Sequence, residues 1–352
     1  MVFLFHYGAG GASSPSHLTR LAGSVLGLGW AGVDLFFVLS GFLITGILLD
    51  SRLREDYYRT FYWRRALRIF PIFYLLAAIL AIAWPHWKPL HATFLLYVGF
   101  PAALLWPWLI AVPVRITHLW SLAVEEQFYC VWPAIVRRVA WQTLLRVCGV
   151  MIVAALILRC IFALVAISWM YPFILSRCDS LAVGAALAIT LRRLPNVYAA
   201  IKRMAPLVLA ACILGLIMVC VARGTTNYTD PLVGTVGYSL LAIGGGAAVA
   251  LAASTAWAIH LFSFLPLRIL GRYSYGLYLY HFPLTSITEK FKTHLPGGPL
   301  VYVAVCFALN LAIAAISFHL IEAPIMAWGR NKTLRPTHKH PVNGVIRVGP
   351  AV

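Results

Sequence analysis

The sequence is short of charge, and above all of acidic residues. Only 11% of its 352 residues are charged, and 10 acidic residues stand against 28 Lys and Arg. A soluble domain carries about 25% charged residues, so this composition, which is 62% hydrophobic, excludes an ordinary soluble protein. We expect an all-α fold: a polytopic bundle of transmembrane helices in contact with the lipid bilayer.

Other signatures are missing as well. The seven cysteines include no C-x-x-C pair and no metal-ligand spacing, so they are expected to be small buried hydrophobic residues, and no metal site is predicted. The first residues lack the basic region and the full apolar region of a signal peptide. No internal repeat is visible, although inverted repeats are common in transporters.

The formal charge of +18 would suggest a nucleic-acid partner in a soluble protein. Here the basic residues cluster between apolar runs, as they do in cytoplasmic loops that face anionic lipid. We therefore expect no nucleic-acid partner. The same loops could also hold a phosphate-bearing ligand.

Apolar runs predict about ten spans in a transmembrane domain over residues 1–329. They cover a short start at 1–7 and then residues 32–49, 69–84, 118–136, 144–167, 177–191, 204–222, 232–253, 272–289 and 299–320. Placing the arginine pairs in the cytoplasm puts both termini there. The Pro-broken stretch 93–111 is expected to be re-entrant or interfacial, and the tail 330–352 to be disordered.

The start of the chain is too short for a span, because a hydrocarbon core needs about 20 residues. The first helix is therefore expected to be truncated, with its first half encoded upstream of Met1. His6 would then lie near the bilayer midplane. A neutral imidazole there can accept a proton from a hydroxyl; the alternative is a histidine that only packs in the core.

Residues 32–45 combine an apolar run with one small, polar face. Helical spacing aligns Asp34, Val38, Gly41 and Thr45 on that face. An acid inside a membrane span is costly and points to a functional site. The alternative is that Asp34 lies at the water boundary.

A second polar face lies on residues 118–136. His118, Ser121, Glu125 and Tyr129 share it, whereas Glu126 points about 100° away from Glu125. A histidine and a glutamate seven residues apart could form an acid–base pair or bind a polar substrate. The alternative is a structural hydrogen bond to a neighbouring helix.

Two further ionisable residues lie within predicted spans. Asp179 fits a capping box with Ser176 as the N-cap residue, which would explain it structurally. His281 ends an aromatic run that begins at Tyr273. Aromatic residues are common near a membrane interface, but a histidine inside the span is not.

Five motifs then occur in one order: residues 32–45, 64–71, 118–129, 177–184 and 271–283. Together they resemble the integral-membrane acyltransferase-3 family, which includes bacterial surface-polysaccharide O-acetylases, and the resemblance covers nearly the whole chain. It implies transfer of an acyl group, commonly acetyl from acetyl-coenzyme A, to a hydroxyl of a carbohydrate, at the bacterial inner membrane. The family's first helix usually carries an arginine, ten intervening residues and a histidine. His6 matches that histidine, and the arginine would lie upstream of Met1.

This resemblance predicts a membrane O-acyltransferase with acyl-CoA as donor and a cell-envelope glycan as acceptor. His6 would act as general base on the acceptor hydroxyl, or would carry the acyl group as a covalent intermediate. Asp34 would orient His6. Glu125 would orient a partner, such as His118 or the acceptor sugar, or would favour the charged form of that partner.

The expected substrate-binding residues include three arginines. Arg64, Arg65 and Arg68 would hold the donor's phosphates at the cytoplasmic mouth, because guanidinium binds phosphate with two parallel hydrogen bonds; otherwise they only mark a cytoplasmic loop. The other members of this set are His118, Trp120, Ser121, Asp179 and His281. The rival functions are a transporter or flippase of a lipid-linked saccharide and a non-catalytic membrane scaffold.

Overall fold

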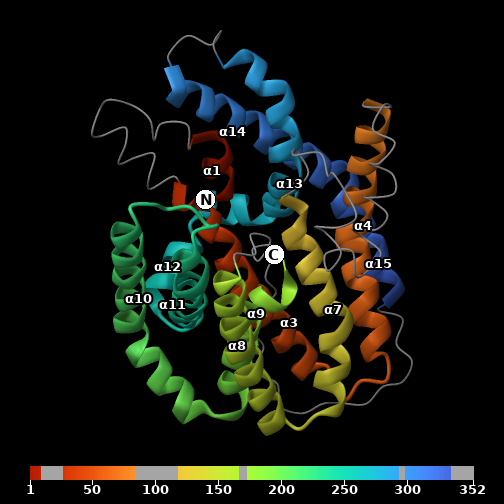
Figure 1. Cartoon of the computed structure of the whole chain (residues 1–352). Coiled ribbons are helices and arrows are strands. Elements are labelled where there is room, and N and C mark those ends of the chain that lie inside the picture. The colour runs from red at the N-terminus through yellow and green to blue at the C-terminus, as the bar shows by residue number, and fades with distance from the viewer. Residues whose placement is uncertain (9–26, 84–117, 166–172, 293–297, 334–352) are drawn as a thin grey trace.

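The computed structural model describes residues 1–8, 27–83, 118–165, 173–292 and 298–333, and the elements in these ranges are helical (Figure 1). The all-α prediction is confirmed. The predicted re-entrant stretch 93–111 lies outside the described residues, as does the chain beyond residue 333.

Long helices occupy the spans that were predicted from residue 32 onward. They are α3 (Gly32–Asp50), α4 (Tyr57–Ala83), α7 (Trp120–Arg138), α8 (Trp141–Leu164), α9 (Ile174–Arg193), α10 (Pro195–Arg223), α11 (Tyr238–Ala252), α13 (Leu265–Thr288) and α14 (Gly298–Ser317). Shorter helical segments complete the described chain: α1 (Val2–Gly8), η2 (Leu28–Ala31), η5 (Val233–Gly237), α12 (Ala256–Phe262), η6 (Glu289–Phe291), η7 (Phe318–Glu322) and α15 (Ala323–Thr333).

Six helical stretches in the described part of the chain are long and apolar enough to cross a membrane: Leu28–Asp50, Trp141–Leu164, Ile174–Arg193, Pro195–Arg223, Val233–Ala252 and Val301–Arg330. The other predicted spans from residue 32 onward lie on α4, α7 and α13, where charged or polar residues interrupt the apolar sequence. The chain is thus a polytopic helical membrane protein, and the total of ten spans stays a prediction.

Helices α3 and α9 form the centre of the bundle, where their backbones touch. A Cβ atom added at Gly41 would overlap the carbonyl of Leu181, and one added at Gly184 would overlap the carbonyl of Val38. Only glycine permits so close an approach at these positions, as is common between membrane helices. The main apolar core lies around this contact, with buried residues from α3, α4, α7, α9 and α13.

The arginine-rich helix ends meet at one end of the bundle, the lower edge of Figure 1. Arg52, after α3, donates to the carbonyls of Arg137 (3.3 Å) and Val139 (2.9 Å) at the end of α7. Arg192, at the end of α9, pairs with Asp50 at 2.7 Å. These contacts agree with the placement of the arginine pairs on one side of the membrane.

Two predicted boundaries were wrong. The span predicted at 69–84 belongs to a helix that begins earlier: α4 starts at Tyr57 and continues through Pro71, and Tyr57, Phe61 and Ile69 on it are buried. The helix α15 continues to Thr333, past the predicted start of the tail at residue 330. Its Trp328 lies against Trp63 of α4, with ring centroids 5.8 Å apart, and this contact favours helix over disorder.

Candidate active site

The short helix α1 is anchored to α13 by its aromatic residues. The hydroxyl of Tyr7 donates to the carbonyl of His281 at 2.9 Å, and Phe3 stacks on Tyr7 with centroids 4.3 Å apart. The His6 ring lies 4.3 Å from the ring of Phe282. These contacts hold His6 against the middle of α13.

His6, His281 and His118, which we call the histidine cluster, come from three distant parts of the sequence. His6 Nδ1 lies 3.0 Å from His281 Nε2, and the His118 ring centroid lies 5.0 Å from that of His281. The sequence had assigned one of these residues to catalysis and two to substrate binding. The structure brings all three together.

His118 is the least satisfied member of the histidine cluster. Its side chain is 4% exposed, and neither ring nitrogen makes a hydrogen bond in this structure. Its carbonyl accepts a hydrogen bond from the hydroxyl of Tyr278 at 2.5 Å, and that hydroxyl also lies 2.5 Å from Ser121 Oγ. The backbone of His118 is therefore fixed, with its ring inside the histidine cluster and beside the backbone of Tyr278 and Leu279.

Asp34 does not take the position that was predicted for it. Its two carboxylate oxygens each accept from Arg177 Nη2 at 2.8 Å, and Ser180 Oγ donates to Oδ1 at 3.1 Å. The prediction that Asp34 orients His6 has no counterpart in this geometry, because a buried guanidinium is the stronger partner for a buried carboxylate. Asp34 is also buried within the protein, where it is 1% exposed.

Asp179 is explained by a second buried ion pair, not by a helix cap. Its Oδ2 lies 2.8 Å from Arg159 Nη2. The capping box was wrong because α9 begins earlier, after Phe173, and Ser176 Oγ donates back to the Phe173 carbonyl at 2.7 Å. Asp179 thus joins α9 to α8.

Trp120 lies beside the buried ion pair of Asp34 and Arg177. The Arg177 guanidinium lies over its ring at 5.8 Å from the centroid, and Phe37 contacts it edge-to-face at 5.9 Å. Ring and guanidinium support one another as a cation–π pair. The predicted role of Trp120 in substrate binding stays a prediction.

Glu125 lies on α7, whereas His118 was predicted on the same helix face but precedes the first residue of α7, Trp120. Glu125 is 2% exposed, and the hydroxyls of Ser40 and Tyr129 are its hydrogen-bonding neighbours. The carboxylate therefore faces a different part of the bundle, and its catalytic role stays a prediction.

The three candidate arginines differ in their exposure and in their neighbours. The Arg65 guanidinium lies 5.1 Å from the ring centroid of Tyr129, and its charge acts on both Glu125 and Glu126. Arg68 is exposed, and its charge acts on Glu322 of η7. Arg64 is exposed as well. Arg65 is thus the one that reaches into the bundle.

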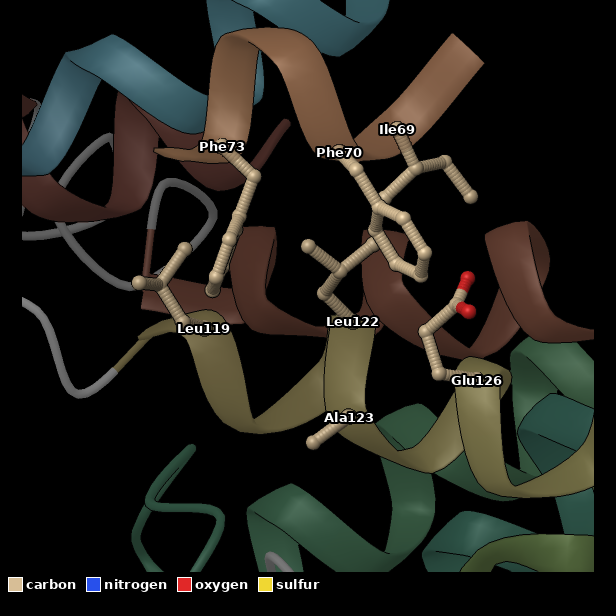
Figure 2. A pocket seen from close by; sticks show the side chains of 7 residues that line it. All are labelled: Ile69, Phe70, Phe73, Leu119, Leu122, Ala123 and Glu126. Atoms are coloured by element: carbon tan, nitrogen blue, oxygen red, sulfur yellow. The ribbon is translucent and has the colours of Figure 1, made fainter. Parts of the chain in front are cut away.

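A small apolar pocket lies between α4 and α7 (Figure 2). It is lined by Ile69, Phe70, Phe73, Leu119, Leu122, Ala123 and Glu126. Figure 2 shows Glu126 and the pair Phe73 and Leu119 at opposite ends, with the carboxylate directed toward α4. Glu126 at one end feels the charge of Arg65, and Leu119 at the other end directly follows His118 in the sequence.

Sequence reasoning missed Arg159, Arg177 and Tyr278. Arg159 lies inside the predicted span 144–167, where a charge is rare and signals a partner, so it could have been flagged. Arg177 stands in a motif that was quoted for its family resemblance alone. Tyr278 carried no signal beyond its aromatic run. Among the described residues, no group of three histidine, cysteine, aspartate or glutamate side chains is arranged to hold a metal ion.

Comparison with known proteins defines the class of this helical membrane protein. A family described as an acyltransferase domain matches residues 1–319. The chain therefore belongs to the acyltransferase-3 family, as its motifs predicted, and this membership places it among acyltransferases.

Its relatives are named for O-acetyl transfer. The chain is 31% identical to the peptidoglycan O-acetyltransferase OatA of Listeria monocytogenes over 323 residues, which cover 84% of this chain and 51% of the relative. It is 27% identical to the O-acetyltransferase OatA of Staphylococcus aureus over 329 residues, 86% of this chain and 53% of the relative. The chain thus spans about half the length of these relatives. No solved structure matches it.

Proposed function

We propose that the chain transfers an acyl group, specifically acetyl, from acyl-coenzyme A to a hydroxyl of a cell-envelope glycan. The observation that carries this proposal is the histidine cluster, a buried site in which His6 and His118 can meet a substrate together. The relatives' names favour acetyl as the acyl group and peptidoglycan as the first acceptor to test.

The chemistry assigned to His6 is general-base catalysis. Its free ring nitrogen takes the proton of the acceptor hydroxyl while the hydroxyl oxygen attacks the thioester carbonyl. The carbon–sulfur bond then breaks, and the thiolate leaves with the proton that His6 received. The ester and free coenzyme A are the products, and His6 returns to its neutral form.

His118 is assigned to the carbonyl side of the reaction. Because it is buried and lies in the histidine cluster, we assign its ring N–H to the oxygen that gains negative charge during attack. A buried, fixed donor of this kind is worth more than one in water. Ser121 and Tyr278 hold the His118 backbone in place through their hydrogen bonds.

The arginine end is assigned to the donor's phosphates, on the cytoplasmic side. Arg65 is the primary candidate because it reaches inward beside Glu125 and Glu126. The pocket of Figure 2 lies between this end and His118, and we assign it to the path of the thioester arm. Its lining residues Ile69 and Leu119 directly follow Arg68 and His118 in the sequence.

The test measures thioester consumption and glycan esterification by the full chain in proteoliposomes, with acetyl-coenzyme A and peptidoglycan fragments. His6→Ala should reduce turnover by about 10²–10⁴-fold, the usual contribution of a general base. His260→Ala is the matched control, because His260 is exposed on α12, and it should behave as wild type.

Two results would count against the proposal. Turnover of His6→Ala at the wild-type rate would overturn the role of His6. A wild-type protein that consumes no thioester with any glycan fragment, but moves a lipid-linked saccharide across the bilayer, would favour the transporter alternative.

A further inference from the structure

His281 was predicted to bind substrate, but both of its ring nitrogens are already engaged. Nδ1 lies 2.6 Å from the carbonyl oxygen of Tyr278, one turn earlier on α13. Nε2 lies 3.0 Å from His6 Nδ1. The side chain is 1% exposed. It therefore has no free polar atom to offer a substrate.

The hydrogen bonds of His281 fix where its proton lies. A carbonyl oxygen only accepts, so His281 Nδ1 must carry the proton that it donates to Tyr278. In the neutral ring, Nε2 is then unprotonated and can only accept. The contact with His6 consequently requires that His6 Nδ1 be the donor.

The surroundings of His6 lead independently to the same assignment. His6 Nδ1 also lies 3.1 Å from the carbonyl oxygen of Val2, which again requires a proton on Nδ1. One N–H is thus shared between two acceptors, Val2 O and His281 Nε2. The unprotonated nitrogen of neutral His6 is therefore Nε2, on the far side of the ring from His281.

We propose that His281 is the positioning residue of this site: it accepts the Nδ1 proton of His6 and so presents His6 Nε2 as the base. This inference rests on the proposed function. It assigns to a neutral histidine the role that the sequence had given to Asp34, whose carboxylate is bound by Arg177 and Ser180. His281 is held for the task by its own bond to Tyr278 and by the bond from Tyr7 to its carbonyl.

The arrangement acts again during the reaction. When His6 Nε2 takes the hydroxyl proton, His6 becomes an imidazolium, and its Nδ1–H bond to His281 Nε2 becomes charge-assisted and stronger. The proton stays on His6, because its transfer to His281 Nε2 would move the positive charge to the more deeply buried ring. The imidazolium then returns its proton to the leaving thiolate, and the hydrogen bond to His281 relaxes to its neutral form.

Two amide substitutions separate positioning from substrate binding. His281→Gln places an amide oxygen at about the distance of Nε2 along the side chain and can still accept from His6. His281→Asn places its amide near Nδ1 only, so that it can keep the bond to Tyr278 but cannot reach His6. Both are polar and smaller than or similar to histidine in volume, which makes them a matched pair.

The expected result is a loss of kcat at nearly constant KM. His281→Asn should lower kcat by about 100-fold, as misplaced catalytic groups do, while KM for the glycan changes less than about twofold. His281→Gln should stay within about tenfold of wild-type kcat. Equal kcat in the two variants, or a rise in KM as the main effect of both, would overturn the inference.

A direct measurement of the His6 tautomer does not depend on activity. Nitrogen-15 NMR of the full chain with labelled histidine distinguishes protonated from unprotonated ring nitrogens, and the His6 signals are identified as those missing in His6→Gln. We expect the proton on Nδ1 in wild type and a larger fraction on Nε2 in His281→Asn. A proton on Nε2 of His6 in wild type would overturn the inference, whereas absence of thioester consumption would overturn the proposed function alone.

Discussion

At the scale of single residues, the buried charges separate into those that already have partners and those that face the site. Asp34 and Arg177 are 1% and 0% exposed in their side chains, and they satisfy one another at 2.8 Å. Removing one member of such a pair leaves an uncompensated buried charge at about 3–5 kcal/mol. Loss of activity on substitution of Asp34 would therefore report a damaged fold, and it is not a test of catalysis.

Glu125 and Glu126 allow a sharper comparison, because they are neighbours on α7 with different surroundings. Glu125 is enclosed by Ser40, Tyr129 and the charge of Arg65, whereas Glu126 lies at the end of the apolar pocket. We expect Glu125→Gln to lower kcat/KM for acyl-coenzyme A at least about tenfold, or about 1.4 kcal/mol of barrier, through a misplaced Arg65. Glu126→Gln should cost less.

The measurement is donor saturation in proteoliposomes, with both variants matched for yield and thermal stability. A larger loss in Glu126→Gln than in Glu125→Gln would show that the carboxylate at the pocket, and not the one beside Tyr129, serves the donor.

At the scale of helices, the contact of α3 with α9 makes a prediction about small residues. An alanine Cβ at position 184 would overlap the carbonyl of Val38, so α9 must shift away from α3. We expect Gly184→Ala to destabilise the chain by about 1–3 kcal/mol, the usual cost of overpacking. The melting temperature in detergent should fall by several degrees.

Gly149→Ala is the control for this substitution. Gly149 lies on α8, and an added Cβ would meet nothing within 4 Å. Since alanine is the better helix former by about 1 kcal/mol, this variant should melt at or above the wild-type temperature. Equal melting of the two variants would mean that α3 and α9 are not packed backbone to backbone.

The positions of helices could be predicted from the sequence, but their neighbours could not. Helices appear where apolar runs were found, because in lipid every backbone group must be satisfied within its own helix. That His118 and Ser121 lie close together was predictable from their spacing, although His118 precedes the start of α7. Partners on other helices were not: Asp34 was assigned to His6, and Arg177 was not considered, because helical periodicity says nothing about which helices become neighbours.

At the scale of the whole molecule, the arginine-rich end and the proposed catalytic residue His6 lie at different heights of the bundle. Arg52, Arg137 and Arg192 meet at one end, while His6 lies on α1, which Figure 1 places toward the other. This separation suits a reaction whose donor arrives from the cytoplasm and whose acceptor arrives from outside. It requires that the arginine end face the cytoplasm, as the excess of Lys and Arg in cytoplasmic loops predicts.

Cysteine labelling from each side of the membrane tests that orientation. Leu53, 95% exposed beside the arginine end, and Thr229, exposed in the turn after α10, are the two reporter positions. In a background with Cys130→Ala and Cys160→Ala, which removes the exposed native thiols of the described chain, an impermeant maleimide should label Thr229→Cys in intact cells. Leu53→Cys should react only after the membrane is opened, because a turn between Arg52 and Arg54 is retained on the cytoplasmic side by its charge. Labelling of Leu53→Cys in intact cells would show that the bundle has the opposite orientation. The arginines would then face outward and could not meet a cytoplasmic donor.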